Sequence, residues 1–164
     1  MSEVQSFLEA NAHYAEQFSA GDLAAPPARH VAIVTCMDAR LDPAKILGLR
    51  EGDAHVIRNA GGRIDADALR SLIISEQLLG TTEIVVIHHT DCGMMTFSNT
   101  DLHERLRERF GVDAGDMDFL PFSDLEQSVR DDIAALRNSP FIPGDVTISG
   151  FIYDVRSGRL NPVE

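Results

Sequence analysis

Two cysteines and one histidine follow two apolar runs of the sequence, and these side chains are the first candidates for chemistry. Cys36 comes directly after the β-branched run at residues 30–35, and His89 and Cys92 follow the run at residues 83–88. Because ligand sites in open α/β sheets collect at the carboxyl ends of the strands, we expect the three side chains to meet there. Two thiolates and one imidazole suit Zn²⁺, so the pattern predicts one zinc ion per chain.

The fourth coordination position of such a zinc ion decides the function. Structural zinc sites are closed by four protein ligands, whereas catalytic sites keep one position for water or substrate. Asp38 lies two residues after Cys36, and Arg40 lies two residues further on. Asp38 bound to zinc would close the site, whereas Asp38 held by Arg40 would leave room for water and accept a proton from it. The two arrangements predict opposite activities, and the residues alone leave both open.

A second histidine stands beside the first. His88 and His89 are adjacent, so the alternation of side chains along a strand sends them to opposite faces, and only one can readily join Cys92. The spacing favours His89 as the ligand. We interpret His88 as a hydrogen-bonded histidine of the core or of an interface.

Helical and strand patterns alternate along most of the chain. Helices are expected over residues 3–19, 42–49, 65–79, 101–110 and 123–138, and strands over residues 30–35, 54–57, 83–88 and 146–153. This alternation predicts an α/β fold with a mainly parallel central β-sheet flanked by helices. A chain of 164 residues is expected to form a single domain, residues 1–164.

The charge of the chain restricts its partners. Lys and Arg number 14 against 26 Asp and Glu, which gives a formal net charge of -12 at pH 7. This balance opposes binding to nucleic acids and to anionic membranes, and it favours a small neutral or weakly charged substrate. The N-terminus has no signal-peptide pattern and no apolar run could span a bilayer, so we expect a cytoplasmic protein. Two cysteines in a reducing cytoplasm are not expected to form a structural disulfide.

Three segments together resemble the β-class carbonic anhydrases. They are CMDAR at residues 36–40, RNAGG at residues 58–62 and HTDCG at residues 89–93. The short chain and the segment HHTDCGM are most similar to the compact bacterial branch of that family.

The resemblance implies a site and a reaction. Cys36, His89 and Cys92 would be the zinc ligands, and Asp38 with Arg40 would form the dyad that orients or deprotonates the zinc-bound water. The implied reaction is the reversible hydration of CO₂ to bicarbonate and a proton by zinc-bound hydroxide.

The resemblance also implies an assembly. The family usually builds its site at a dimer interface, with the N-terminal helix laid over the partner subunit. The amphipathic pattern at residues 3–19, followed by a connector that contains two prolines, fits that role. We therefore expect the N-terminal helix to pack on a dimer partner in a homodimer or a dimer of dimers.

Two other functions stay open at this point. Members of the family with the same metal site can act on sulfur analogues of CO₂, so hydrolysis of carbonyl sulfide is one alternative. The other is a non-catalytic protein whose zinc site stays closed by Asp38, which would bind zinc without turnover at any pH.

Overall fold

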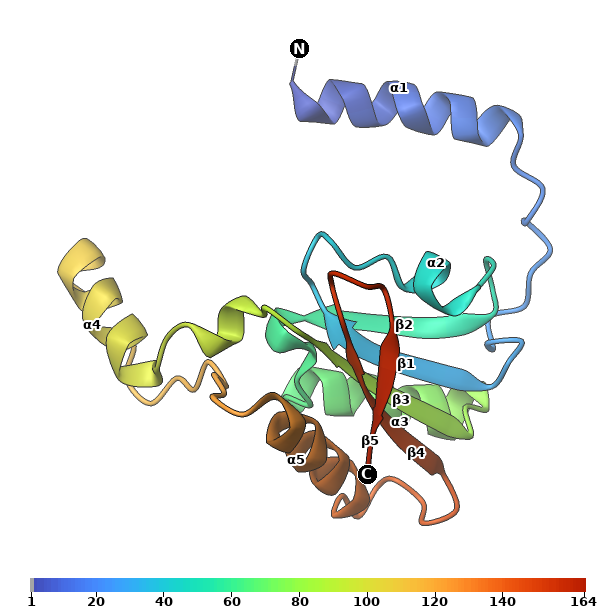
Figure 1. The fold of residues 1–164 in the computed structure, drawn as a ribbon. Helices are drawn as coiled ribbons and strands as arrows, with labels where there is room; N and C mark the ends of the chain where they lie inside the picture. Colours follow the sequence, from blue (N-terminus) through green and yellow to red (C-terminus); the bar gives the residue numbers. More distant parts are fainter. Residues whose placement is uncertain (1) are drawn as a thin grey trace.

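The computed structural model describes residues 2–164 (Figure 1). Its helices are α1 (Glu3–Glu16), α2 (Pro43–Leu47), α3 (Ala66–Leu79), α4 (Asn99–Phe110) and α5 (Leu125–Arg137). Its strands are β1 (Val31–Cys36), β2 (Ala54–Asn59), β3 (Glu83–His89), β4 (Thr147–Tyr153) and β5 (Leu160–Val163), and two short 3₁₀ turns are η1 (Ala60–Gly62) and η2 (Gly93–Met95). The strands form one sheet in the order β2-β1-β3-β4-β5, in which β5 alone pairs antiparallel. The predicted α/β fold with a mainly parallel sheet is confirmed.

The helix ends follow capping signals in the sequence. The Asp65 carboxylate accepts a hydrogen bond from the Ala68 amide at 2.7 Å at the start of α3, and Gly80 ends that helix with a φ of 73°. Helix α2 stops before the predicted residue 49, because Gly48 adopts a φ of 63° and accepts the left-handed conformation that ends a helix. Helix α1 ends at Glu16, whereas the apolar pattern suggested a helix as far as residue 19.

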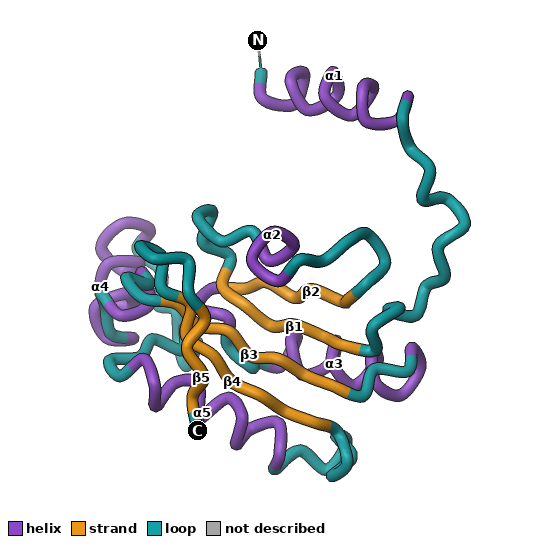
Figure 2. Tube along the Cα trace, turned by 45° about the vertical axis from the view of Figure 1, so that its right-hand side comes forward, coloured by secondary structure: helices purple, strands orange, loops and turns teal. Residues whose placement is uncertain are grey.

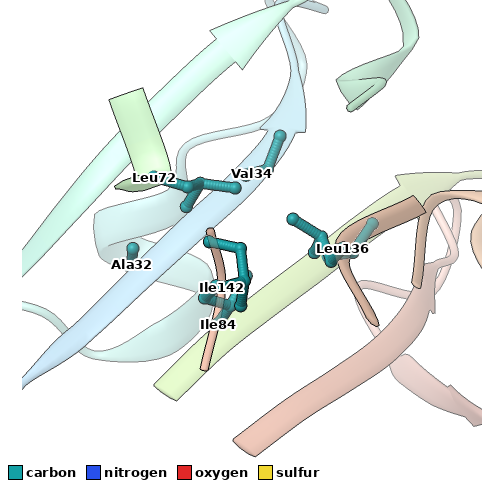
Figure 3. Close-up of a cluster of buried hydrophobic side chains, with 7 residues drawn as sticks. Ala32, Val34, Leu72, Ile84, Leu136 and Ile142 are labelled. Atoms are coloured by element: carbon teal, nitrogen blue, oxygen red, sulfur yellow. The ribbon is translucent and has the colours of Figure 1, made fainter. Parts of the chain in front are cut away.

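One face of the sheet is covered by α3 and α5 (Figures 1 and 2). Alternate residues of β1 and β3 point to this face and pack with Leu72 of α3 and Leu136 of α5 (Figure 3); they are Ala32, Val34, Ile84 and Val86. Gly150 of β4 allows α5 to approach closely, because an added Cβ there would lie 2.5 Å from the Val129 side chain. Helix α5 is thus fixed against β4 and its neighbour β3.

The opposite face of the sheet is less covered. Helix α2 lies on this side (Figure 2), and beside it a mainly apolar groove of about 330 Å³ opens over Val31, Ile33, Val85 and Phe151, with Arg29 and Glu83 also in its lining. Helix α1 stands apart from the sheet at the end of a long connector, and none of its residues is buried (Figure 1). No helix within residues 2–164 is long and apolar enough to cross a bilayer.

Strand β5 was not among the predicted elements. Its four residues, LNPV, include Pro162, which cannot donate a hydrogen bond to a neighbouring strand. The strand lies at the edge of the sheet, where a proline is tolerated, and its partner β4 holds it through antiparallel pairing.

Candidate metal centre

Cys36, His89 and Cys92 come together at the carboxyl edge of the sheet. The two sulfurs and a ring nitrogen of the histidine all lie within 4.8 Å of one another, and all three residues are buried. They meet because β1 and β3 are parallel neighbours, so that the loops after both strands leave the same edge. The structure therefore brings the three residues together as expected, and their role as ligands stays a prediction.

His89 is oriented to offer a lone pair to a metal. Its Nδ1 donates a hydrogen bond to the Thr90 carbonyl oxygen at 2.9 Å, so in the neutral ring Nε2 is the unprotonated nitrogen. Among residues 2–164, this Nε2 is the only buried side-chain nitrogen or oxygen without a hydrogen-bond partner. An unpartnered buried polar atom costs on the order of 1–3 kcal/mol, and a metal ion would remove that cost.

The two sulfurs titrate as a pair. The pKa of the Cys36 thiol is lowered to about 4, chiefly because the Cys92 thiol donates a hydrogen bond to the Cys36 thiolate, and burial opposes this shift. The same hydrogen bond and burial raise the pKa of Cys92 above its ordinary value. One thiolate therefore forms readily and the second with difficulty, whereas a divalent cation between the sulfurs would stabilise both. This donor set fits Zn²⁺.

Asp38 is held by Arg40 in a two-point ion pair. Arg40 Nε and Nη2 donate to the two carboxylate oxygens at 3.0 and 2.8 Å, and the Arg40 backbone amide donates to Oδ1 at 2.9 Å. These hydrogen bonds hold the pKa of Asp38 well below its usual range, so the carboxylate is ionised at neutral pH. Of the two arrangements left open by the sequence, the structure has the one in which Asp38 is paired with Arg40.

The same arginine connects the two loops of the site. Its Nη1 donates to the Asp91 carboxylate at 2.8 Å, and its Nη2 donates to the Asp91 carbonyl oxygen at 2.9 Å. Asp38 Oδ2 lies 3.8 Å from His89 Nε2, so the carboxylate borders the space that the three candidate ligands surround. The sequence reasoning did not select Asp91, although its place between His89 and Cys92 was a signal.

The RNAGG segment packs against the backbone of the first loop. Arg58 donates to the carbonyl oxygens of Cys36 and Asp38 at 3.0 and 2.7 Å. Gly62 has a φ of 70°, and an added Cβ there would lie 2.8 Å from the carbonyl carbon of Thr35. Only glycine allows this approach, so the segment supports the backbone position of Cys36.

The fold and the site define an α/β protein with a buried Cys-His-Cys cluster at the carboxyl edge of its sheet. The family model described as carbonic anhydrase matches residues 31–112. β-Carbonic anhydrase 1 of Mycobacterium tuberculosis is 42% identical, with 99% of both chains covered. The crystal structure of a carbonic anhydrase from Streptococcus mutans matches with a TM-score of 0.96 at 57% identity, covering 100% of this chain and 99% of that chain. The chain belongs to the β-carbonic anhydrase family, as the three motifs predicted.

Another relative bears the name of a different activity. A protein named carbon disulfide hydrolase, from Acidithiobacillus thiooxidans, is 36% identical over 84% of this chain and 78% of its own length. Carbon disulfide, like carbonyl sulfide, is a sulfur analogue of CO₂. The similarity therefore bears on the sulfur-substrate alternative.

Proposed function

We propose that this protein catalyses the zinc-dependent reversible hydration of CO₂ to bicarbonate and a proton. The observation that carries the proposal is the buried cluster of Cys36, His89 and Cys92, in which His89 Nε2 has no hydrogen-bond partner, beside the ionised Asp38. When bound, zinc would supply a hydroxide nucleophile near neutral pH.

Each side chain has a role in this proposal. The two thiolates and His89 Nε2 would hold the metal, and the Thr90 carbonyl keeps the imidazole ring in the correct tautomer. Asp38 accepts a proton at Oδ2, because that oxygen receives one bond from Arg40 and keeps a lone pair on the side of His89. Arg40 keeps the carboxylate ionised and holds both of its oxygens by hydrogen bonds.

The first test is CO₂ hydration followed by stopped-flow on protein of measured zinc content, over about pH 7 to 9. Turnover is expected to rise in proportion to zinc, up to one ion per chain. Full zinc occupancy without CO₂ turnover at any pH in this range would contradict the proposal. A non-catalytic zinc site would give that result, although the Asp38–Arg40 pairing speaks against it.

A second candidate function is hydrolysis of carbonyl sulfide or carbon disulfide at the same metal. The similarity to a relative named carbon disulfide hydrolase favours it. The metal chemistry is shared, so the shape of the route to the site decides between substrates. Side-by-side assays with CO₂, carbonyl sulfide and carbon disulfide are expected to give the highest kcat/KM with CO₂.

We also propose a single domain in the cytoplasm. All five strands join one sheet, which supports one domain over residues 1–164. Cys36 and Cys92 are both free, and a reducing compartment would keep these two thiols available to a metal.

For the assembly we propose a homodimer in which α1 packs on a second copy of the chain. Helix α1 exposes a set of large apolar or aromatic side chains: Val4, Phe7, Leu8, Tyr14 and, just beyond its end, Phe18. The Tyr14 hydroxyl donates a hydrogen bond to Glu51, which ties the C-terminal half of α1 to its own subunit. The apolar groove over Val31 and Phe151 offers a second copy's helix a complementary surface.

Replacing Phe7 by aspartate is expected to weaken this dimer by at least about tenfold, because the interface would then bury a charge. Sedimentation velocity over a range of concentrations measures the change as a shift from dimer to monomer. Glu9→Gln on the same helix is the matched control and is expected to leave the dimer intact. An unchanged sedimentation coefficient for Phe7→Asp would show that α1 is not the contact.

A further inference from the structure

A buried polar cluster lies beside the candidate metal ligands, and the proposed reaction does not use it. Its members are His88, Ser128, Asp132 and Arg63, here called the His88 cluster. The first three are 0%, 1% and 3% exposed, and the side chains of the Arg63–Asp132 ion pair are 12% and 4% exposed. A buried ion pair is a weak source of stability, because desolvation offsets the attraction between the charges. The contacts of the cluster indicate a positional role instead.

The cluster joins α5 to the end of β3 and to the segment after η1. His88 Nε2 donates to Asp132 Oδ2 at 3.0 Å, and His88 Nδ1 lies 2.7 Å from the Ser128 hydroxyl. Asp132 also accepts hydrogen bonds from Arg63 Nε at 3.3 Å and from the Ile64 amide at 3.2 Å. One carboxylate of α5 thus holds two separate segments at once.

Through β3 the cluster reaches the first candidate ligand. His88 immediately precedes His89, and successive side chains of a strand point to opposite faces. With the His88 ring fixed on the α5 side, the His89 ring is directed to the other side of β3, and one of its nitrogens lies within 4.8 Å of the Cys36 and Cys92 sulfurs.

The cluster also contacts the η1 turn, which packs against Cys36, the second candidate ligand. The Gly62 carbonyl oxygen lies 3.3 Å from His88 Nε2. The Gly62 Cα is packed so closely on the first loop that an added Cβ would lie 2.9 Å from the Cys36 nitrogen. The neighbouring Arg63 is held by Asp132. The cluster therefore holds the η1 turn against the backbone of Cys36.

The ring of Phe122 connects the cluster to the surroundings of Cys92, the third candidate ligand. Phe122 stacks on the His88 ring with centroids 5.5 Å apart, and the Arg63 guanidinium lies 5.5 Å from the centre of the same Phe122 ring. The Phe122 amide donates to the Met94 carbonyl oxygen at 3.3 Å, and Met94 belongs to the buried apolar cluster that contains Cys92.

We propose that His88, Asp132 and Arg63 are positioning residues of the metal centre. They fix the spacing of Cys36, His89 and Cys92 and thereby raise the affinity of the site for zinc. Residues behind the ligands have this effect in many metal sites, where their replacement weakens metal binding by about 10- to 100-fold. The proposal rests on the zinc site of the proposed function and is independent of the substrate.

The test is the affinity of Asp132→Asn for zinc, measured by competition with a chromophoric chelator. Asparagine keeps the size of the side chain and removes the charge that holds Arg63. The dissociation constant is expected to rise about 10- to 100-fold. The visible absorption bands of the cobalt-substituted protein are expected to shift, because they report the geometry of the ligands directly.

Leu72→Ala is the matched control. Leu72 is fully buried in the main core on α3, so its replacement lowers the thermal midpoint without touching the His88 cluster. Its zinc affinity and cobalt spectrum are expected to stay as in the unmodified protein. If Asp132→Asn lowers the midpoint as Leu72→Ala does but leaves both metal readouts unchanged, the cluster is merely structural and the proposal is wrong.

A milder variant covers the case in which Asp132→Asn does not fold. Ser128→Ala removes one hydrogen-bond partner of His88 and is expected to raise the dissociation constant for zinc by a few-fold. An unchanged constant for folded Ser128→Ala would then overturn the proposal. Failure of the proposed function has a separate signature, namely an unmodified protein that binds zinc tightly and does not hydrate CO₂.

Discussion

Replacing Cys92 by alanine is expected to abolish zinc binding and CO₂ hydration together. The variant keeps Cys36 and His89, but two protein ligands hold zinc far more weakly than three. Without the metal no hydroxide is available near neutral pH, so turnover should fall by at least about a thousandfold. Zinc content per chain, measured by mass spectrometry of the metal, and stopped-flow CO₂ hydration give the two readouts on one sample.

The control for this variant comes from the same segment of the chain. Met95 lies in the η2 turn three residues after Cys92, and its side chain is 39% exposed. Met95→Ala is therefore expected to keep both zinc and turnover. Retention of zinc and of turnover in Cys92→Ala would contradict the assignment of this residue as a ligand, and with it the proposed site.

Local signals in the sequence were sufficient for most of the fold. Helix α3 was predicted from the capping residue Asp65 to Gly80, and the structure places its ends there, because both signals act within one turn of the helix. Strand β5 was not predicted, since its stability comes from pairing with β4 rather than from its own residues. The position of α1 apart from the sheet is likewise not described by any pattern within the helix.

The residues of the candidate site were predicted from the sequence, but the hydrogen bonds that support them were not. The ends of two strands were enough to bring Cys36 near His89 and Cys92, because parallel neighbours share an edge. His88 was interpreted as a hydrogen-bonded core or interface histidine, which the structure confirms. Its partner Asp132 is 44 residues away in the sequence, so this pairing depends on how α5 packs on the sheet.

The orientation of the Asp38 side chain also depends on contacts that are distant in the sequence. Its side chain can turn to a metal or to Arg40, and nothing within the CMDAR segment selects one direction. Arg40 is itself held by Asp91, from the loop after β3, through two hydrogen bonds. This contact between the loops supports the Asp38–Arg40 pairing, and it becomes visible only when the two strands are placed side by side.

Replacing Asp38 by asparagine is expected to lower CO₂ hydration by about 100- to 1,000-fold while zinc stays bound. The amide has nearly the same shape, but it cannot accept a proton as the carboxylate does. Asp91→Asn is the matched control, because it also changes a partner of Arg40, on a side chain that is 71% exposed. That control is expected to lose only a few-fold in turnover. Loss of zinc from Asp38→Asn would instead identify Asp38 as a ligand.

The pH dependence of that variant tests the direction in which Asp38 points. The hydrogen bonds from Arg40 hold the pKa of Asp38 well below its usual range, so the carboxylate stays ionised throughout pH 7 to 9. Any rise in turnover over this range must therefore come from another group, and the ratio of unmodified to Asp38→Asn turnover is expected to be constant. If Asp38 instead left Arg40 for the metal at the lower pH, the unmodified protein alone would be closed there. The ratio would then climb steeply with pH, against the pairing described here.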